Sequence, residues 1–133
     1  MKRLSLILSL IFISLISCAS EVESEKPVQH LQLPDVTSIE AAEKVFLAKT
    51  EELKNIKTFD ANTLHEIHII TYSLEKSIAY YAENLKGKHK KVAEAMAEQV
   101  EHVHLNSENN RPELTKNHLS QYFALAQNLP LTR

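Results

Sequence analysis

A helical repeat of mostly apolar residues between Leu64 and Leu85 limits what this chain can fold into more than any other feature. The repeat positions alternate between spacings of three and four, and they are Leu64, Ile67, Thr71, Leu74, Ile78, Tyr81 and Leu85. This spacing puts one residue per turn on the same side of an α-helix, whereas a strand would alternate every second residue. The repeat predicts a long helix with one buried face, capped by Asp60 at its start and by Gly87 at the C′ position.

Shorter helical patterns lie on both sides of this segment. Thr37 and Glu40 are spaced as a capping box and predict a helix over 38–57, with Thr37 as the N-cap. A third helix is expected over 89–106 from the apolar positions that recur there.

The last helix is expected after Asn110 or Arg111, with Pro112 in its first turn and Pro130 as its stop. Loops of a few residues make consecutive helices antiparallel. The sequence therefore predicts an all-α fold over residues 37–130, an antiparallel up-down four-helix bundle. A three-helix bundle with a docked fourth helix is the alternative.

The start of the chain carries a different kind of pattern. Lys2 and Arg3 precede an apolar run over residues 4–16, which is too short for a transmembrane helix of about 20 residues. The run ends in Leu15-Ile16-Ser17-Cys18. This segment resembles a bacterial lipoprotein signal peptide with its lipobox.

That resemblance implies cleavage before Cys18, which would carry the acyl chains (palmitate among them) that anchor the protein in a membrane. Residues 1–17 would be the signal peptide, and residues 18–36 the lipidated cysteine with a flexible tether. Ala19 stands where an Asp would favour the inner membrane. The resemblance therefore implies the periplasmic face of the outer membrane.

The charge distribution argues against nucleic acid as a partner. The formal net charge is −2, and it becomes −4 when Lys2 and Arg3 leave with the signal. The one basic run, residues 86–91, has no interleaved aromatic residues. It is expected to be a solvated turn, and contact with anionic lipid is the alternative.

Motifs typical of enzymes do not occur in the sequence. Cys18 is the only cysteine, so lipidation would leave no thiol for a disulfide, a metal or a nucleophile. His65 and His68 are three residues apart, not four as in a zinc-protease motif, and no Gly-x-Ser-x-Gly is present. We expect a protein that is not an enzyme.

Two polar stripes converge if the second and third helices fold back about residues 87–88. Both helices rise 1.5 Å per residue, so position i lies level with about position 175 − i. His68, Tyr72 and Glu75 share one stripe, and His104 and Glu108 share the other. These stripes are expected to meet at the open end of the hairpin.

Facing helices with two imidazoles and one or two carboxylates can hold a metal ion. A zinc, copper or iron site would use His68, Glu75, His104 and Glu108 as ligands, with Tyr72 in support. The alternative, which we expect to be the commoner case, is that charge-assisted pairs only join the two helices. No cofactor is certain from the sequence.

The residues around these stripes also carry a resemblance. The segments Glu66–Glu75 and Val103–Glu108 are similar to paired signatures of a small family of uncharacterised exported proteins of Gram-negative bacteria. The similarity covers about residues 37–129. It implies a short helical periplasmic protein and assigns no catalytic residue.

Two functions are compatible with these observations. We expect a lipid-anchored module that binds another envelope protein through a helix face, with an exposed apolar patch around Tyr80, Tyr81 and Tyr122. The alternative is a bundle that binds a metal or small ligand through the cluster of His68 and His104.

Overall fold

Four α-helices make up the fold in a computed structural model that describes residues 33–130. They are α1 (Ile39–Asn55), α2 (Ala61–Asn84), α3 (Gly87–Glu108) and α4 (Pro112–Ala126). Within this range there is no strand, so the predicted all-α fold is confirmed. None of the four helices is long and apolar enough to span a membrane. The expected signal peptide and most of the expected tether lie outside the described residues.

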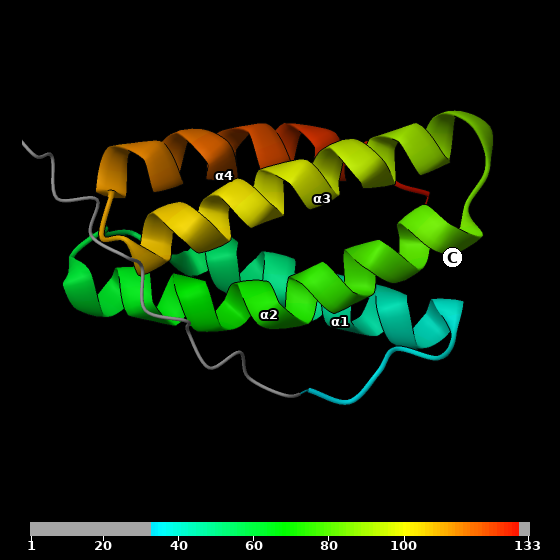
Figure 1. Ribbon diagram of the computed structural model, residues 1–133, viewed down its shortest axis with the longest axis horizontal. Helices are drawn as coiled ribbons and strands as arrows, with labels where there is room; N and C mark the ends of the chain where they lie inside the picture. The colour runs from blue at the N-terminus through cyan, green and yellow to red at the C-terminus, as the bar shows by residue number, and fades with distance from the viewer. Residues whose placement is uncertain (1–32, 131–133) are drawn as a thin grey trace, which may run out of the picture.

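Consecutive helices pack against each other in an up-down arrangement (Figure 1). The α2–α3 interface is the most extensive, followed by α3–α4 and α1–α2. α1 and α4 are joined through the buried hydroxyl groups of Thr50 and Tyr122, whose oxygens lie 2.5 Å apart. Because Tyr122 is fully buried, α4 belongs to the core of a four-helix bundle.

The tyrosines expected in an exposed patch lie elsewhere. Tyr81 and Tyr122 are 1% and 0% exposed, and Tyr80 is partly buried. Tyr81 packs edge-on against Phe46 of α1, with their ring centroids 6.0 Å apart. The predicted apolar docking patch was therefore wrong, because at least two of its three residues fill the core.

Helix starts follow the expected chemistry with one shift. Asp60 caps α2 as predicted, and its carboxylate accepts from the backbone N–H groups of Asn62 and Thr63. The cap of α1 is Ser38, not Thr37, and its hydroxyl accepts from the Ala41 N–H at 3.1 Å. Of the two candidate caps of α4, the N-cap is Arg111, and Pro112 is the first residue of the helix as predicted.

The turn between α2 and α3 differs from the predicted cap. α2 ends at Asn84, and its C-cap Leu85 is extended, so Gly87 is not the C′ residue. Gly87 instead begins α3, with φ of +59°. The glycine therefore supplies the left-handed backbone that was expected of it, but at the start of the following helix.

We expect Tyr122→Phe to lower the free energy of unfolding by about 1–2 kcal/mol, because it leaves the buried Thr50 hydroxyl without its partner. Urea denaturation followed by circular dichroism measures the effect. Tyr80→Phe is the matched control, since the Tyr80 hydroxyl makes only a 3.5 Å exposed contact with the Thr37 carbonyl. Equal stability of the two variants would contradict a stabilising hydrogen bond between Thr50 and Tyr122.

Candidate metal site at the open end of the α2–α3 hairpin

The antiparallel packing of α2 and α3 brings His68 and His104 together. Their ring centroids are 4.4 Å apart, and the residues are 6% and 3% exposed. Tyr72 meets both rings edge-on, with centroids 5.0 Å from His68 and 4.8 Å from His104. The two polar stripes therefore face each other in the interior, close to the register expected from helical rise.

Glu108 completes a group of three metal-binding side chains. One ligand atom from each of His68, His104 and Glu108 lies within 4.8 Å of the other two. The two histidines are buried and Glu108 is partly exposed. It is the only group of three or more His, Cys, Asp or Glu residues within residues 33–130 that is close enough to hold a metal ion.

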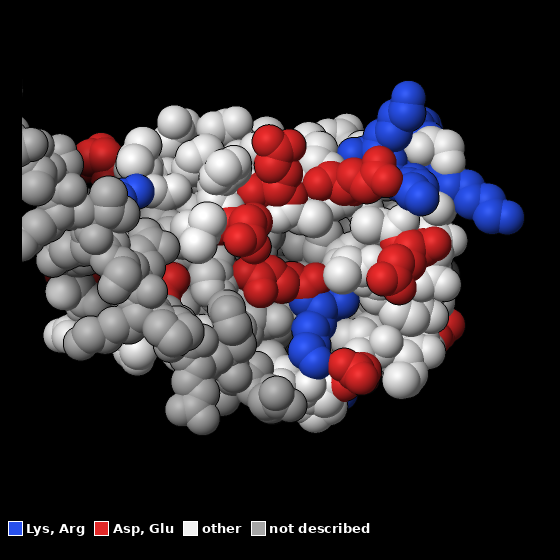
Figure 2. Space-filling model, in the orientation of Figure 1, with Lys and Arg blue, Asp and Glu red and all other residues white. Residues whose placement is uncertain are grey.

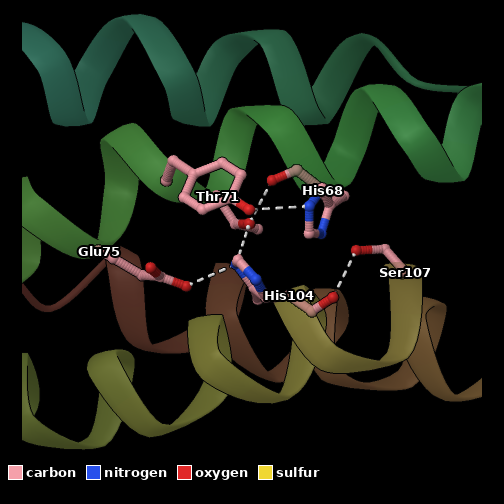
Figure 3. A network of polar contacts seen from close by, with 6 residues as sticks. His68, Thr71, Glu75, His104 and Ser107 are labelled. Atoms are coloured by element: carbon pink, nitrogen blue, oxygen red, sulfur yellow. Dashed lines mark hydrogen bonds and ion pairs between the residues drawn. The ribbon is translucent and has the colours of Figure 1, made fainter. Parts of the chain in front are cut away.

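The Glu75 carboxylate and the Thr71 hydroxyl both contact Nδ1 of the His104 ring (Figure 3). His104 Nδ1 lies 2.9 Å from Glu75 Oε1 and 3.0 Å from Thr71 Oγ1. The Thr71 hydroxyl donates to the His68 carbonyl oxygen at 2.6 Å, so toward His104 it can only accept. Both contacts therefore place the proton on Nδ1, which leaves Nε2 as the nitrogen that can bind a metal.

His68 is held in a corresponding way by Tyr72. The Tyr72 hydroxyl lies 3.1 Å from His68 Nε2. His68 Nδ1 is buried and has no hydrogen-bond partner of good geometry among the described residues, although the His104 backbone is close enough to raise the pKa of His68. When Nε2–H donates to the Tyr72 oxygen, the lone pair of Nδ1 is available to a metal ion.

The two imidazoles are driven toward opposite protonation states. Burial lowers the pKa of His68, and the neighbouring His104 acts in the same direction. The hydrogen bond that the Glu75 carboxylate accepts from His104 raises the pKa of His104 above the ordinary histidine value. A proton taken up by the pair is therefore favoured on His104 over His68.

The structure separates the two carboxylates that the sequence proposed as ligands. Glu108 lies with the histidine nitrogens, whereas Glu75 contacts Nδ1 of His104 and is not in the three-residue group. Tyr72 supports His68 as expected for a residue outside the ligand set. The predicted ligand set is thus reduced to His68, His104 and Glu108.

Thr71 and Ser107 are parts of the site that sequence reasoning did not identify. Thr71 is the one polar member of the apolar repeat, a signal that pointed to a polar contact inside the interface. Ser107 falls just beyond the helix expected over 89–106, but it lies within α3 and is 3% exposed. Its hydroxyl donates to the His104 carbonyl oxygen at 2.9 Å, which fixes the last turn of the helix.

A pocket of about 350 Å³ opens directly onto the group. Its lining comes from the start of α2, the end of α3 and the turn that follows, and consists of Ala61, His65, His68, Ser107, Glu108 and Asn110. The exposed His65 ring stands beside His68, with centroids 6.3 Å apart and planes 20° from parallel. The pocket therefore gives solvent access to two of the three candidate ligands.

A second histidine pair, on α3 and α4, has a different geometry. His102 and His118 stack with centroids 4.6 Å apart and planes 23° from parallel. Nitrogens of stacked rings point along the ring planes and do not converge on one point. His118 Nδ1 is also engaged by Gln99 Oε1 at 2.9 Å. This pair joins two helices and does not form a comparable site.

Charge is distributed unevenly around the site. Figure 2 shows acidic side chains gathered over α2 and α3, and basic side chains grouped where α2 turns into α3. The exposed acids of α3 include Glu94, Glu98 and Glu101, and the basic end carries exposed Lys86, Lys88, Lys90 and Lys91. The candidate site is at the opposite end of the hairpin from these lysines.

The sequence matches a family of unknown function, DUF6746, over residues 1–130. The chain belongs to this family. No curated protein and no solved structure matches it. Membership in DUF6746 therefore assigns no ligand or reaction, and inferences about function rest on the geometry of the site.

We expect Glu75→Gln to lower the pKa of His104, because the amide loses the charge that stabilises the imidazolium. The pair with Glu75 stabilises the fold fully below the ordinary histidine pKa of about 6.5, and this contribution is lost as pH rises through the raised pKa of His104. The substitution should therefore destabilise the metal-free protein most near pH 5–6 and least at alkaline pH. Histidine NMR titration and urea denaturation measure the two effects.

Glu66→Gln is the matched control, because Glu66 is exposed on the same helix. An unchanged His104 pKa in Glu75→Gln would show that the carboxylate does not hold the Nδ1 proton.

Proposed function

We propose that the helical domain binds one divalent transition metal ion through His68, His104 and Glu108, without catalysing a reaction. The convergence of these three side chains within 4.8 Å carries the proposal. Two imidazoles and one carboxylate form a donor set used by zinc and by non-haem iron sites.

The distances require only a small adjustment to hold an ion. Tetrahedral zinc with bonds of about 2.0–2.1 Å places its ligand atoms roughly 3.4 Å apart. The three ligand atoms, within 4.8 Å of one another, would have to close by at most about 1.4 Å. Glu108 is partly exposed and near the end of α3, so its side chain has room to make most of this movement.

Glu75 and Tyr72 are placed as supports for the two imidazoles. Metal-bound histidine commonly donates its other N–H to a carboxylate or another acceptor, which fixes the tautomer and the ring orientation. Glu75 stands 2.9 Å from His104 Nδ1, and the Tyr72 hydroxyl stands 3.1 Å from His68 Nε2. These contacts support metal binding through the opposite nitrogen of each ring.

Protons compete with the metal at His104. The imidazolium must lose its Nε2 proton before that nitrogen can bind an ion, whereas Nδ1–H stays with Glu75. Affinity should therefore rise with pH through the raised pKa of His104.

We expect the full chain, purified without a histidine tag, to bind about one equivalent of Zn²⁺ or Co²⁺ at pH 7.5. Calorimetry and elemental analysis measure this. His104→Ala should abolish binding, and Glu108→Gln should weaken it at least tenfold because it removes one of three ligands. Glu108→Gln changes a partly exposed residue, so it separates loss of a ligand from loss of the fold.

His89→Ala is the control, since His89 lies at the opposite end of the hairpin. Equal metal binding by Glu108→Gln, His104→Ala and the unaltered protein would overturn the proposed site. No binding by the unaltered protein would overturn the proposed function.

We further propose that a lipid on Cys18 holds this domain at the periplasmic face of the outer membrane. The charged start, the short apolar run and the Leu15-Ile16-Ser17-Cys18 segment support this location.

An envelope protein that binds the domain through a helix face also stays a proposal. The exposed large apolar side chains of residues 33–130 are distributed one to each helix: Leu47, Ile69, Leu105 and Leu114.

We expect Cys18→Ser to move the protein out of the membrane fraction when it is expressed in a Gram-negative host, because the acylated sulfur is lost. Incorporation of labelled palmitate, followed by fractionation, measures the change. Unchanged membrane association without label in either protein would contradict the lipid anchor.

A further inference from the structure

The three proposed ligands leave one coordination position of a bound metal ion unfilled by the protein, and the pocket lies beside them. Three protein ligands leave a tetrahedral ion with one position for an outside donor, as in catalytic zinc sites, whereas structural sites use four protein ligands. Among the described residues no fourth side chain of the ligand types joins the group. The remaining position must therefore be filled from outside the group.

The packing around His104 leaves the pocket as the route by which an outside ligand can reach the ion. His104 is 3% exposed, and its Nδ1 side is occupied by Glu75 and Thr71. Neither of these two residues lines the pocket, whereas His68 and Glu108 do. An incoming ligand would thus reach the ion past His68 and Glu108.

The pocket is small, and all of its described lining residues except Ala61 have polar side chains. Its volume of about 350 Å³ is at the lower end of the range for small-molecule sites. Glu108 is the only carboxylate among the described lining residues, and it would be bound to the metal. A divalent ion with two neutral imidazoles and one carboxylate keeps a formal charge of +1 on the ion and its three ligands, so its open position favours an anionic donor. Glu75 offsets part of this charge, but it contacts Nδ1 of His104 and does not line the pocket.

The mouth of the pocket offers hydrogen-bond donors for such an anion. His65 and Asn110 line it, from α2 and from the turn after α3. An imidazole N–H and a side-chain amide both donate to carboxylate oxygens. Asn110 is held at the mouth by a left-handed backbone, with φ of 54°.

We propose that the bound metal keeps one coordination position open to this pocket, and that a small free carboxylate binds there with His65 and Asn110 contacting its outer oxygen. This inference rests on the proposed metal site. It assigns the site a ligand class and assigns His65 and Asn110 the role of positioning residues.

The test uses the full chain loaded with Co²⁺, whose visible absorption bands report on coordination. Titration with acetate should change these bands with saturation, whereas acetamide at equal concentration should not. His65→Ala and Asn110→Gly should each weaken acetate binding at least threefold and leave Co²⁺ affinity unchanged. Glycine suits the positive φ at position 110, so this variant removes the amide without straining the turn.

Two failures are distinguishable in this experiment. Visible bands of bound Co²⁺ that do not respond to acetate would overturn the open position while leaving the metal site intact. Failure to take up Co²⁺ at all would overturn the proposed function, and the carboxylate site with it.

His89→Ala, at the far end of the hairpin, is the control and should match the unaltered protein in both Co²⁺ uptake and the response to acetate. An equal acetate response in His65→Ala, Asn110→Gly and the unaltered protein would overturn the role of the two positioning residues.

Discussion

The register of α2 against α3 is the constraint on which both the core and the candidate site depend. Thr71 and Tyr72 meet His104 across this interface, and Glu75 meets it one turn further along. A shift of one residue along either helix would rotate its side chains by about 100°. The same shift would remove apolar residues of α2 from the core, so the apolar packing fixes the polar cluster in place.

Local sequence rules were sufficient to predict the four helices. They were not sufficient to predict every helix cap or every contact between the helices. The Asp60 cap and Pro112 in the first turn of α4 were predictable because few residues suit those positions. Thr37 and Ser38 are both good caps and stand next to each other, so the sequence could not choose between them. The sequence could not pair the Tyr122 hydroxyl with Thr50, because the two residues are 72 positions apart.

The sequence could predict which residues of the two helices lie near each other at the candidate site. It could not predict which of their side chains make contact. The helical rise places His68 level with residues 107–108 and Tyr72 level with residues 103–104. The helical period places Glu75 on the stripe of His68 and Glu108 on the stripe of His104. Which carboxylate faces Nδ1 and which faces the pocket depends on side-chain rotamers, which spacing does not determine. For the same reason the roles of Thr71 and His65 emerged only from the folded arrangement.

The chain enters the bundle beside the second half of α2. There Ser77 Oγ donates to the Ala42 carbonyl oxygen, and Lys76 pairs with Asp35. The pocket lies at the first turns of α2, and His68 is about 12 Å along the helix from Lys76. An attachment through the N-terminal segment would therefore engage none of the described residues that line the pocket, so anchoring and ligand access would use separate parts of the bundle.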